Sequence, residues 1–554
     1  MIKIHAKPTG ATSTVRPSSL RKTLCVLQLC AVVFALACAS TGVHAQKSSN
    51  GARAQRLPAP EKIVGDYLKA TGGKKRLMAI RDTTYEWMSA PAEDGSVVWE
   101  VRQKAPASAR MDSANSTTSE GGKISAAANA RSAWMRDAGG LSRTLTGAEA
   151  GAAKLQAALS ASHLIDYKKL NILARTVALD RTAGEPAYII EFSTREGARL
   201  RYYFSAASKL LLKISDEARQ TETSFSDYRA EGNGTLEPHR LQIAVKDNAP
   251  RSFTLQTARY NTNIADAVFD PPTAEALDIP ALLREVEKNQ KKIDQRVADY
   301  SYTEKRTERE INDRGEETKK IVKIVEIVRL QGGGEFSRLI SENGVPLSPE
   351  RAAKQDKQIQ EQVAKYEEAR EKREQKKLEA EKNGTTKKKK DDDDDLKVAD
   401  FVRICEFVSP RRERFQDREA IVFDVRPRPG FRPTNRTESI VAKLNGVAWI
   451  DPADKEIMRF EARFAEGIKV GGGLLASIRP GATFTFEQAR VSTDGVWLPR
   501  FSQANVSARV LLFKGFNVNV TQEFSDYRRS KTEFKDYKIE APTADTAPPQ
   551  KPQD

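Results

Sequence analysis

The feature that most constrains this chain of 554 residues is an ordered set of matches between its two halves. Phe225, Arg229, Gly234 and Pro238 recur with identical spacing from Phe486 onward, at an offset of 261 residues. Other matches continue upstream at offsets of 233 and 246, and further matches follow downstream. Because a fixed order of matches over most of both halves marks a structural repeat, we predict two modules of one kind.

A second resemblance between the halves, the pentapeptide FSDYR, does not follow this register. It occurs at 225–229 and again at 524–528. The first copy aligns with 486–490, and the second aligns with the neighbourhood of Tyr260. We therefore expect the two copies on different strands, and we interpret the shared letters as a coincidence of edge-strand composition.

The first 45 residues are typical of a secretory signal peptide. Arg21 and Lys22 precede an apolar run at 24–38, which is too short to anchor the chain across a membrane. Small residues at 43 and 45 suit cleavage before Gln46. We therefore predict an exported protein of the periplasm of a Gram-negative bacterium, with a disordered linker at 46–59.

The alternative is a lipid-anchored envelope protein processed at Cys38, but the aliphatic residue usual three positions earlier is missing. Cleavage after residue 45 leaves Cys405 as the only cysteine, so no internal disulfide is expected. Removal of the signal also lowers the formal net charge from +16 to +11. Such an excess suits anionic membrane lipid or lipopolysaccharide better than nucleic acid, although an ordinary solvated surface explains it as well.

Short strands dominate both halves. Apolar and polar side chains alternate along these strands. For example, Met458, Phe460 and Phe464 are apolar, and Arg459 and Glu461 between them are charged. Helices are predicted at about 61–71, at 146–170, after Pro280 and from 348. A sheet of this kind must cover its apolar face. The small number of predicted helices can cover it only if the sheet curls around them.

We therefore predict a mainly β protein with α-helices (α+β), built as two tandem curved antiparallel half-barrels that each enclose a few helices. The modules are placed at 60–275 and 276–540, with a disordered tail at 541–554. The second module carries a charged helical and low-complexity insert at 352–397, rich in Lys, Glu and Asp. Apolar residues are too sparse there to bury a face, so we expect an exposed extension with coiled-coil-like composition.

Several motifs resemble the outer-membrane lipoprotein-sorting family, which has the LolA/LolB-like fold of periplasmic lipid and lipoprotein carriers. These are "EKIVGDYLKATGGKKRLMAI" near the start of the first module, "FSDYR…G…P" and "ARYNTNIADAVFDPP" at its end, and more loosely "GVAWIDPADKEIMRF" and "DGVWLP" in the second. The resemblance implies a curved antiparallel sheet around short helices that binds acyl chains or lipoproteins without a cofactor. Two modules in one chain and the charged insert depart from the simple carrier pattern.

The sequence offers no catalytic or metal constellation. The mature chain keeps only His163 and His239, which are far apart and lack metal-ligand spacing. Cys405 lies among apolar residues, as a buried structural cysteine would. No G-x-S-x-G or H-E-x-x-H motif occurs. We therefore predict a protein that is not an enzyme and needs neither cofactor nor metal.

The predicted function is binding of acyl chains, lipid or a lipoprotein against apolar concave sheet faces, with contact to a membrane surface at a loop tip. The candidate residues are Leu474, Leu475 and Ile478 at the mouth, in an insertion at 466–484, and Phe516, Val518 and Val520 as wall. The alternative is an envelope-stress sensor of the same fold that contacts a protein partner through the charged insert. Catalytic residues are not predicted, nor is a nucleic-acid partner.

Overall fold

The computed structural model describes most of the chain downstream of residue 56. The described residues are 57–90, 95–115, 123–273, 278–297, 300–329, 335–382, 403–464, 466–470, 476–491, 495–510 and 514–529. The predicted signal peptide, its cleavage site, Cys38 and the tail at 541–554 lie outside these ranges, as do 383–397 of the charged insert. The module limits of 60–275 and 276–540 therefore stay predictions.

A first antiparallel sheet of 13 strands is formed between residues 82 and 260, in the order β6-β5-β4-β3-β2-β1-β13-β12-β11-β10-β9-β8-β7. Its first and last strands in sequence pair near its middle, where Thr83 of β1 lies opposite Tyr260 of β13. The strands are β1 Asp82–Ser89, β2 Val97–Lys104, β3 Ser108–Asn115, β4 Ile124–Ala128, β5 Ala133–Arg136, β6 Ser142–Thr144, β7 Leu173–Thr182, β8 Glu185–Ser193, β9 Arg199–Ser205, β10 Leu211–Asp216, β11 Thr221–Ala230, β12 Leu236–Val245 and β13 Arg251–Tyr260.

A second antiparallel sheet follows, in the order β17-β16-β15-β14-β26-β25-β24-β21-β20-β19-β18, and the short strands β22 and β23 join it beside β25. Its strands are β14 Tyr300–Ile311, β15 Glu317–Arg329, β16 Glu335–Glu342, β17 Val345–Pro346, β18 Cys405–Phe415, β19 Arg418–Pro427, β20 Leu444–Asp451, β21 Glu456–Phe464, β22 Ile468–Val470, β23 Ala476–Ile478, β24 Thr483–Arg490, β25 Trp497–Val510 and β26 Lys514–Arg529. The predicted mainly β class with two antiparallel sheets is confirmed.

The two strand orders superimpose over eleven positions. β14 takes the place of β1, β26 that of β13, and β18 that of β7, with every strand between them in the same sequence of neighbours. Phe225 lies in β11 and Phe486 in the corresponding β24, as the offset of 261 residues predicts. β22 and β23 fall within the predicted insertion at 466–484. Among the described residues, β5 and β6 have no counterpart in the second sheet.

The two FSDYR copies lie on different strands, β11 and β26, as expected. The interpretation as edge-strand composition is wrong, because both strands have neighbours on either side. What the copies share is a local geometry: Asp227 and Asp526 both adopt φ near +55°. The next residue then donates its hydroxyl to a backbone carbonyl, Tyr228 to Leu211 at 2.7 Å and Tyr527 to Pro499 at 2.6 Å.

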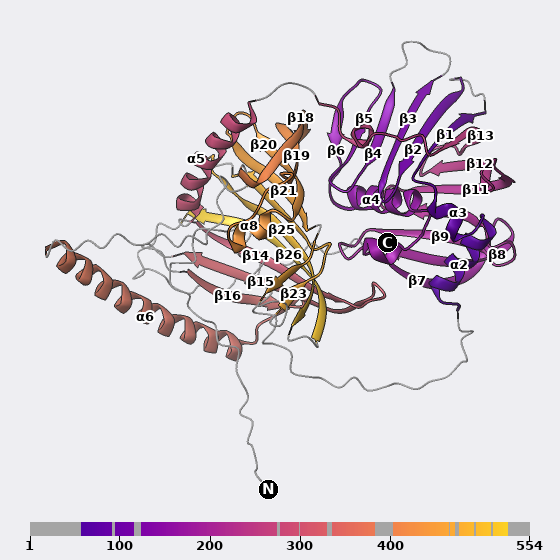
Figure 1. The fold of residues 1–554 in the computed structure, drawn as a ribbon. Helices are drawn as coiled ribbons and strands as arrows, with labels where there is room; N and C mark the ends of the chain where they lie inside the picture. Colours follow the sequence, from indigo (N-terminus) through magenta and orange to yellow (C-terminus); the bar gives the residue numbers. More distant parts are fainter. Residues whose placement is uncertain are drawn as a thin grey trace, which may run out of the picture.

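Helices cover the inner faces of the sheets (Figure 1). Pro60 starts the first of them, and Asn435 caps the last by accepting a hydrogen bond from the Glu438 amide at 2.8 Å. Within the described residues, none of the helices combines the length and apolar character that crossing a membrane requires. They are α2 Pro60–Ala70, α3 Lys74–Met78, α4 Gly147–Ala161, α5 Ile279–Val297, α6 Pro349–Lys382 and α8 Arg436–Val441, with 3₁₀ turns η2 Tyr167–Leu170 and η3 Asp266–Phe269.

α6 differs from the other helices. Its first turns pack on β16, where the Gln355 side chain bonds both backbone groups of Leu339 at 3.1 Å and Val363 is buried. Farther along, Glu368 and Lys372 pair with each other and are about two-thirds exposed. Figure 1 shows the helix projecting away from the second sheet.

Candidate binding site

The inner face of the first sheet is filled by helices at one end. Val64 and Leu68 of α2 and Leu155 and Leu159 of α4 form one buried cluster with the strand residues Ile190, Phe192, Leu200, Tyr202, Phe204 and Leu211. The side chain of Tyr67 meets the ring of Phe204 edge to face, with centroids 5.3 Å apart. This end of the module is therefore occupied by its own side chains.

A second apolar cluster continues along the same face, and we name it the aromatic strip. Its buried members are Tyr85, Trp87, Val97, Leu241, Phe253 and Leu255, and Trp99, Val101, Phe225, Ile243 and Ala258 pack against it only half-buried. Phe225 also packs against the helix-covered cluster, so the strip lies on the face that carries α2. The ring of Trp99 lies 4.2 Å from that of Phe253.

Polar groups gather where the strip approaches α2. Glu237 accepts a weak hydrogen bond from the Tyr260 hydroxyl at 3.5 Å and another from Thr235 at 3.4 Å. Burial raises the pKa of the Glu237 carboxyl to about 7. Burial also raises the pKa of the Tyr67 and Tyr85 hydroxyls, and the charge of Glu237 adds to the shift. The strip is thus apolar along its length and hydrogen-bonding at one end.

The second module holds the six residues predicted from sequence. Ile478 of β23 pairs with Ala508 of β25, while Val518 and Val520 of β26 lie opposite Val506 and Ala504 of the same strand. Since paired residues share a face, these three residues converge on one apolar face, and all three are buried. The backbone of Phe516 lies in β26 opposite Ala508, but its side chain is outside the described set. Leu474 and Leu475 lie outside the described residues altogether.

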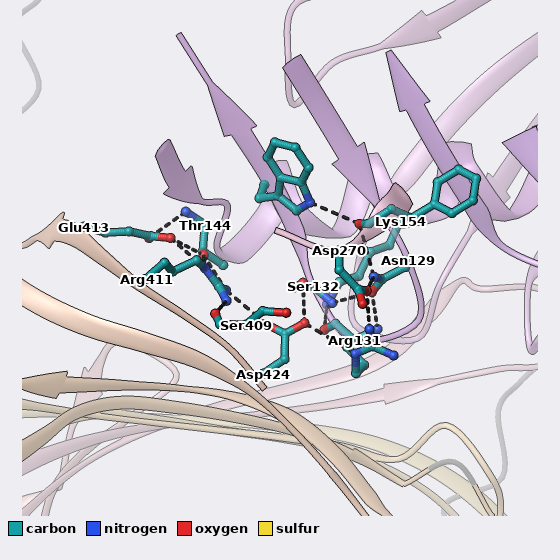
Figure 2. Close-up of polar contacts among 12 residues, drawn as sticks. Asn129, Arg131, Ser132, Thr144, Lys154, Asp270, Ser409, Arg411, Glu413 and Asp424 are labelled. Atoms are coloured by element: carbon teal, nitrogen blue, oxygen red, sulfur yellow. Dashed lines mark hydrogen bonds and ion pairs between the residues drawn. The ribbon is translucent and has the colours of Figure 1, made fainter. Parts of the chain in front are cut away.

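The two modules meet through a buried polar network, drawn in Figure 2, that the sequence did not reveal. Arg411 of β18, only 1% exposed, donates to the Thr144 hydroxyl at 2.7 and 3.0 Å, to Glu413 at 2.9 Å and to Asp424 at 3.1 Å. Glu413 in turn accepts from the Thr144 amide and hydroxyl, both at 2.7 Å. One residue at the end of β6 therefore ties the first module to two charges of the second.

Asp424 extends this network toward the end of the first sheet. It accepts from the Ser132 hydroxyl at 2.9 Å and from Arg131 at 3.4 Å, and Arg131 also pairs with Asp270. Lys154 of α4 donates to the Arg131 carbonyl at 2.8 Å, and burial lowers the pKa of its ammonium group. Each buried charge here has a partner of opposite sign or a hydrogen bond, which is the condition for keeping it inside.

Two turns of the second module complete the contact, and each needs a glycine. Gly315, at φ +80°, lies so close to the first module that an added Cβ would stand 2.7 Å from the Ser193 hydroxyl. Gly481, at φ +89°, would place its Cβ 3.1 Å from the amide nitrogen of Asn171. Both turns combine a backbone conformation that favours glycine with a close approach between modules.

The described residues include Cys405 and His163, two of the side chains considered in the sequence. No group of three or more His, Cys, Asp or Glu side chains placed to hold a metal occurs among them. Cys405 is buried, and burial raises the pKa of its thiol to about 12, so it stays protonated. Burial lowers the pKa of His163 to about 4, which keeps this imidazole neutral at pH 7.

Comparison with known proteins gives likenesses at the level of the fold. No family model matches the chain, and no curated protein matches it in sequence. Among solved structures, a domain named for outer-membrane lipoprotein sorting from Vibrio parahaemolyticus is similar at 11% identity and a TM-score of 0.27, covering 38% of this chain and 97% of that one. A LolA-superfamily protein from Nitrosomonas europaea gives 10% identity, a TM-score of 0.27 and coverages of 39% and 98%.

The complex of MucA and MucB from Pseudomonas aeruginosa is similar at 8% identity and a TM-score of 0.17, covering 83% of this chain and 94% of that one. These structures include proteins of the lipoprotein-sorting group that the sequence motifs resemble. These likenesses concern the fold alone.

Proposed function

We propose that this chain is a non-enzymatic binding protein of the periplasm that takes up an acyl chain, as free lipid or as part of a lipoprotein. The observation that supports this is the aromatic strip, in which Trp99, Val101, Phe225 and Ile243 stay half-buried on the inner face of the first sheet. Each methylene that leaves water against such a surface contributes about 0.8 kcal/mol. An acyl chain can therefore bind without a catalytic group or a cofactor.

The ends of the strip suit a ligand with a polar head. The hydroxyl of Tyr260 and the carboxyl of Glu237 lie where the strip approaches α2. The acyl chain would run along Trp99 and Val101, and its carbonyl end would meet these donors and acceptors. In the second module, Ile478, Val518 and Val520 with Leu474, Leu475 and Phe516 stay the proposed mouth and wall of an equivalent site.

Binding is tested by titrating the protein with a brominated fatty acid and following tryptophan fluorescence. Trp87 and Trp99 lie in the strip, so bound bromine atoms are expected to quench their emission. Val101→Asp places a charge in the strip and is expected to weaken binding at least tenfold. Val345→Asp is the matched control, because Val345 is 68% exposed and outside the strip.

Mass spectrometry of lipids that co-purify with the protein provides a second readout. Absence of quenching together with an empty lipid extract would overturn the proposal, and so would equal binding by the Val101→Asp and Val345→Asp variants.

A second candidate function is contact with a protein partner through α6. It is favoured by the form of this helix, which packs by its first turns and then projects with Glu368 and Lys372 exposed. Deletion of 367–397 should then abolish capture of that partner while leaving fatty-acid quenching unchanged. Retained capture would count against the helix as the contact.

A further inference from the structure

A cleft of about 1540 Å³ lies between the modules, away from the aromatic strip. The first module contributes one face of β7, β8 and β9, and the second contributes the β14–β15 turn and Arg479. Its lining includes six basic side chains, Lys168, Arg175, Arg195, Arg201, Arg314 and Arg479, and five acidic ones, Glu61, Asp180, Glu191, Asp313 and Glu316.

The basic residues of the cleft differ in how they are neutralised. Arg175 and Arg201 share the buried carboxylate of Glu191, at 2.9 and 3.4 Å. Among the described residues, Arg195 pairs with Asp313 at 3.7 Å, and that carboxylate is 83% exposed. Arg314 and Arg479 form no ion pair with another described residue. The positive charge without a close carboxylate therefore lies at Arg195 of the first module and at Arg314 and Arg479 of the second.

Arg195 carries an unmet hydrogen-bond donor. Its Nη1 atom is buried and has no partner in the described part of the chain. Burial lowers the pKa of this guanidinium; the charge of Asp313 opposes the lowering and the charge of Arg479 adds to it. A buried donor without a partner costs about 1–3 kcal/mol. Arg195 and Arg479 line the same cleft, so an anion bound there would offset both the unpaired donor and the like charge.

We propose that this cleft binds an oxyanion of the phosphate type between Arg195 of the first module and Arg479 of the second. The planar guanidinium group offers paired N–H donors that match two oxygens of a phosphate. Asn171, which also lines the cleft, supplies a neutral side-chain amide beside the Gly481 turn. Because the ligand touches both modules, its binding also strengthens their contact.

The same chemistry can come from free phosphate or from the phosphate of a lipid headgroup, and the experiment separates them. Thermal unfolding of the full chain is followed in inorganic phosphate, in glycerol 3-phosphate and with dihexanoyl phosphatidic acid, against chloride at equal ionic strength. A ligand bound only by the native state raises the melting temperature, and the rise grows with the logarithm of the ligand concentration above its dissociation constant. Inorganic phosphate should act if the free ion is the ligand, and only the diacyl compound should act if a headgroup is.

Arg195→Gln and Arg479→Gln are each expected to weaken binding at least tenfold, so each variant should need at least ten times the ligand concentration to reach the melting-temperature shift of the unmodified chain. Arg199→Gln is the matched control, because Arg199 is exposed, belongs to β9 and does not line the cleft. Arg195→Lys keeps the positive charge and should retain part of the affinity. This variant therefore distinguishes loss of binding from loss of folding. The proposal is overturned if none of the three compounds shifts the melting temperature beyond chloride, or if Arg199→Gln weakens binding as much as Arg195→Gln.

Discussion

Removal of Arg411 is expected to destabilise the contact between the modules by about 3 kcal/mol. Deleting one partner of a buried ion pair costs roughly 3–5 kcal/mol, because it leaves an uncompensated charge inside. Arg411→Leu leaves both Glu413 and Asp424 buried. The lower end of the range applies, since Asp424 keeps Arg131 and Ser132 and Glu413 keeps the Thr144 amide and hydroxyl.

The measurement is equilibrium urea unfolding followed by tryptophan fluorescence, with each transition fitted separately because a two-module chain need not unfold in one step. Arg412→Leu is the control: the neighbouring Arg412 pairs with Glu419 at 2.6 Å with both side chains largely exposed, so its loss should cost less than about 1 kcal/mol. Adding Glu413→Gln to Arg411→Leu should recover part of the loss, since it removes one unpaired charge. A free energy of unfolding for Arg411→Leu equal to that of Arg412→Leu would refute the reasoning.

Three further outcomes are expected. Gly315→Ala should lower the melting temperature more than Gly344→Ala, because both glycines have φ near +80° but only Gly315 faces a neighbour; calorimetry showing equal losses would argue against a tight module contact. The raised pKa of Glu237 means that the folded state holds the proton more tightly than the unfolded one, so stability is full below about pH 4.5 and falls as pH rises through about 7. Melting curves of Glu237→Gln between pH 4.5 and 8 should lack this slope, and an unchanged slope would assign it to another group. Tyr527→Phe should cost about 1 kcal/mol in urea unfolding through loss of the bond to Pro499, and a neutral result would mean that water replaces the bond.

The strands and the correspondence between the two halves could be predicted from sequence, whereas the strand order within each sheet and the contact between modules could not. The alternation of apolar and polar residues from Met458 to Phe464 is a local pattern that predicts a strand. The ordered repeat predicts that the two halves share one arrangement of strands. In the sequence, nothing distinguishes Arg411, Glu413 and Asp424 from charged residues on the solvent-exposed face of a strand. Their burial depends on Thr144 and Ser132, which lie more than 260 residues away in the chain.

The aromatic strip also could not be predicted from sequence, because it depends on how the helices pack on the sheet. Spacing along a strand assigns an aromatic residue to one face of a sheet, but it does not say which part of that face the helices leave uncovered. The positive φ that the aspartate of FSDYR adopts in both β11 and β26 could not be predicted, because φ of a single residue is not visible in strand propensity. Of the residues predicted for the second module, Val518 and Val520 follow from the alternation rule, whereas Ile478 was predicted at a loop tip and lies in β23.

The contact between the modules is made by different parts of the two copies: β6 and the turn before β5 of the first copy meet β18 and β19 of the second. Within the described residues, β6 belongs to the first copy only. The contact is therefore heterologous, since it joins one surface of the repeated unit to a different surface of its neighbour.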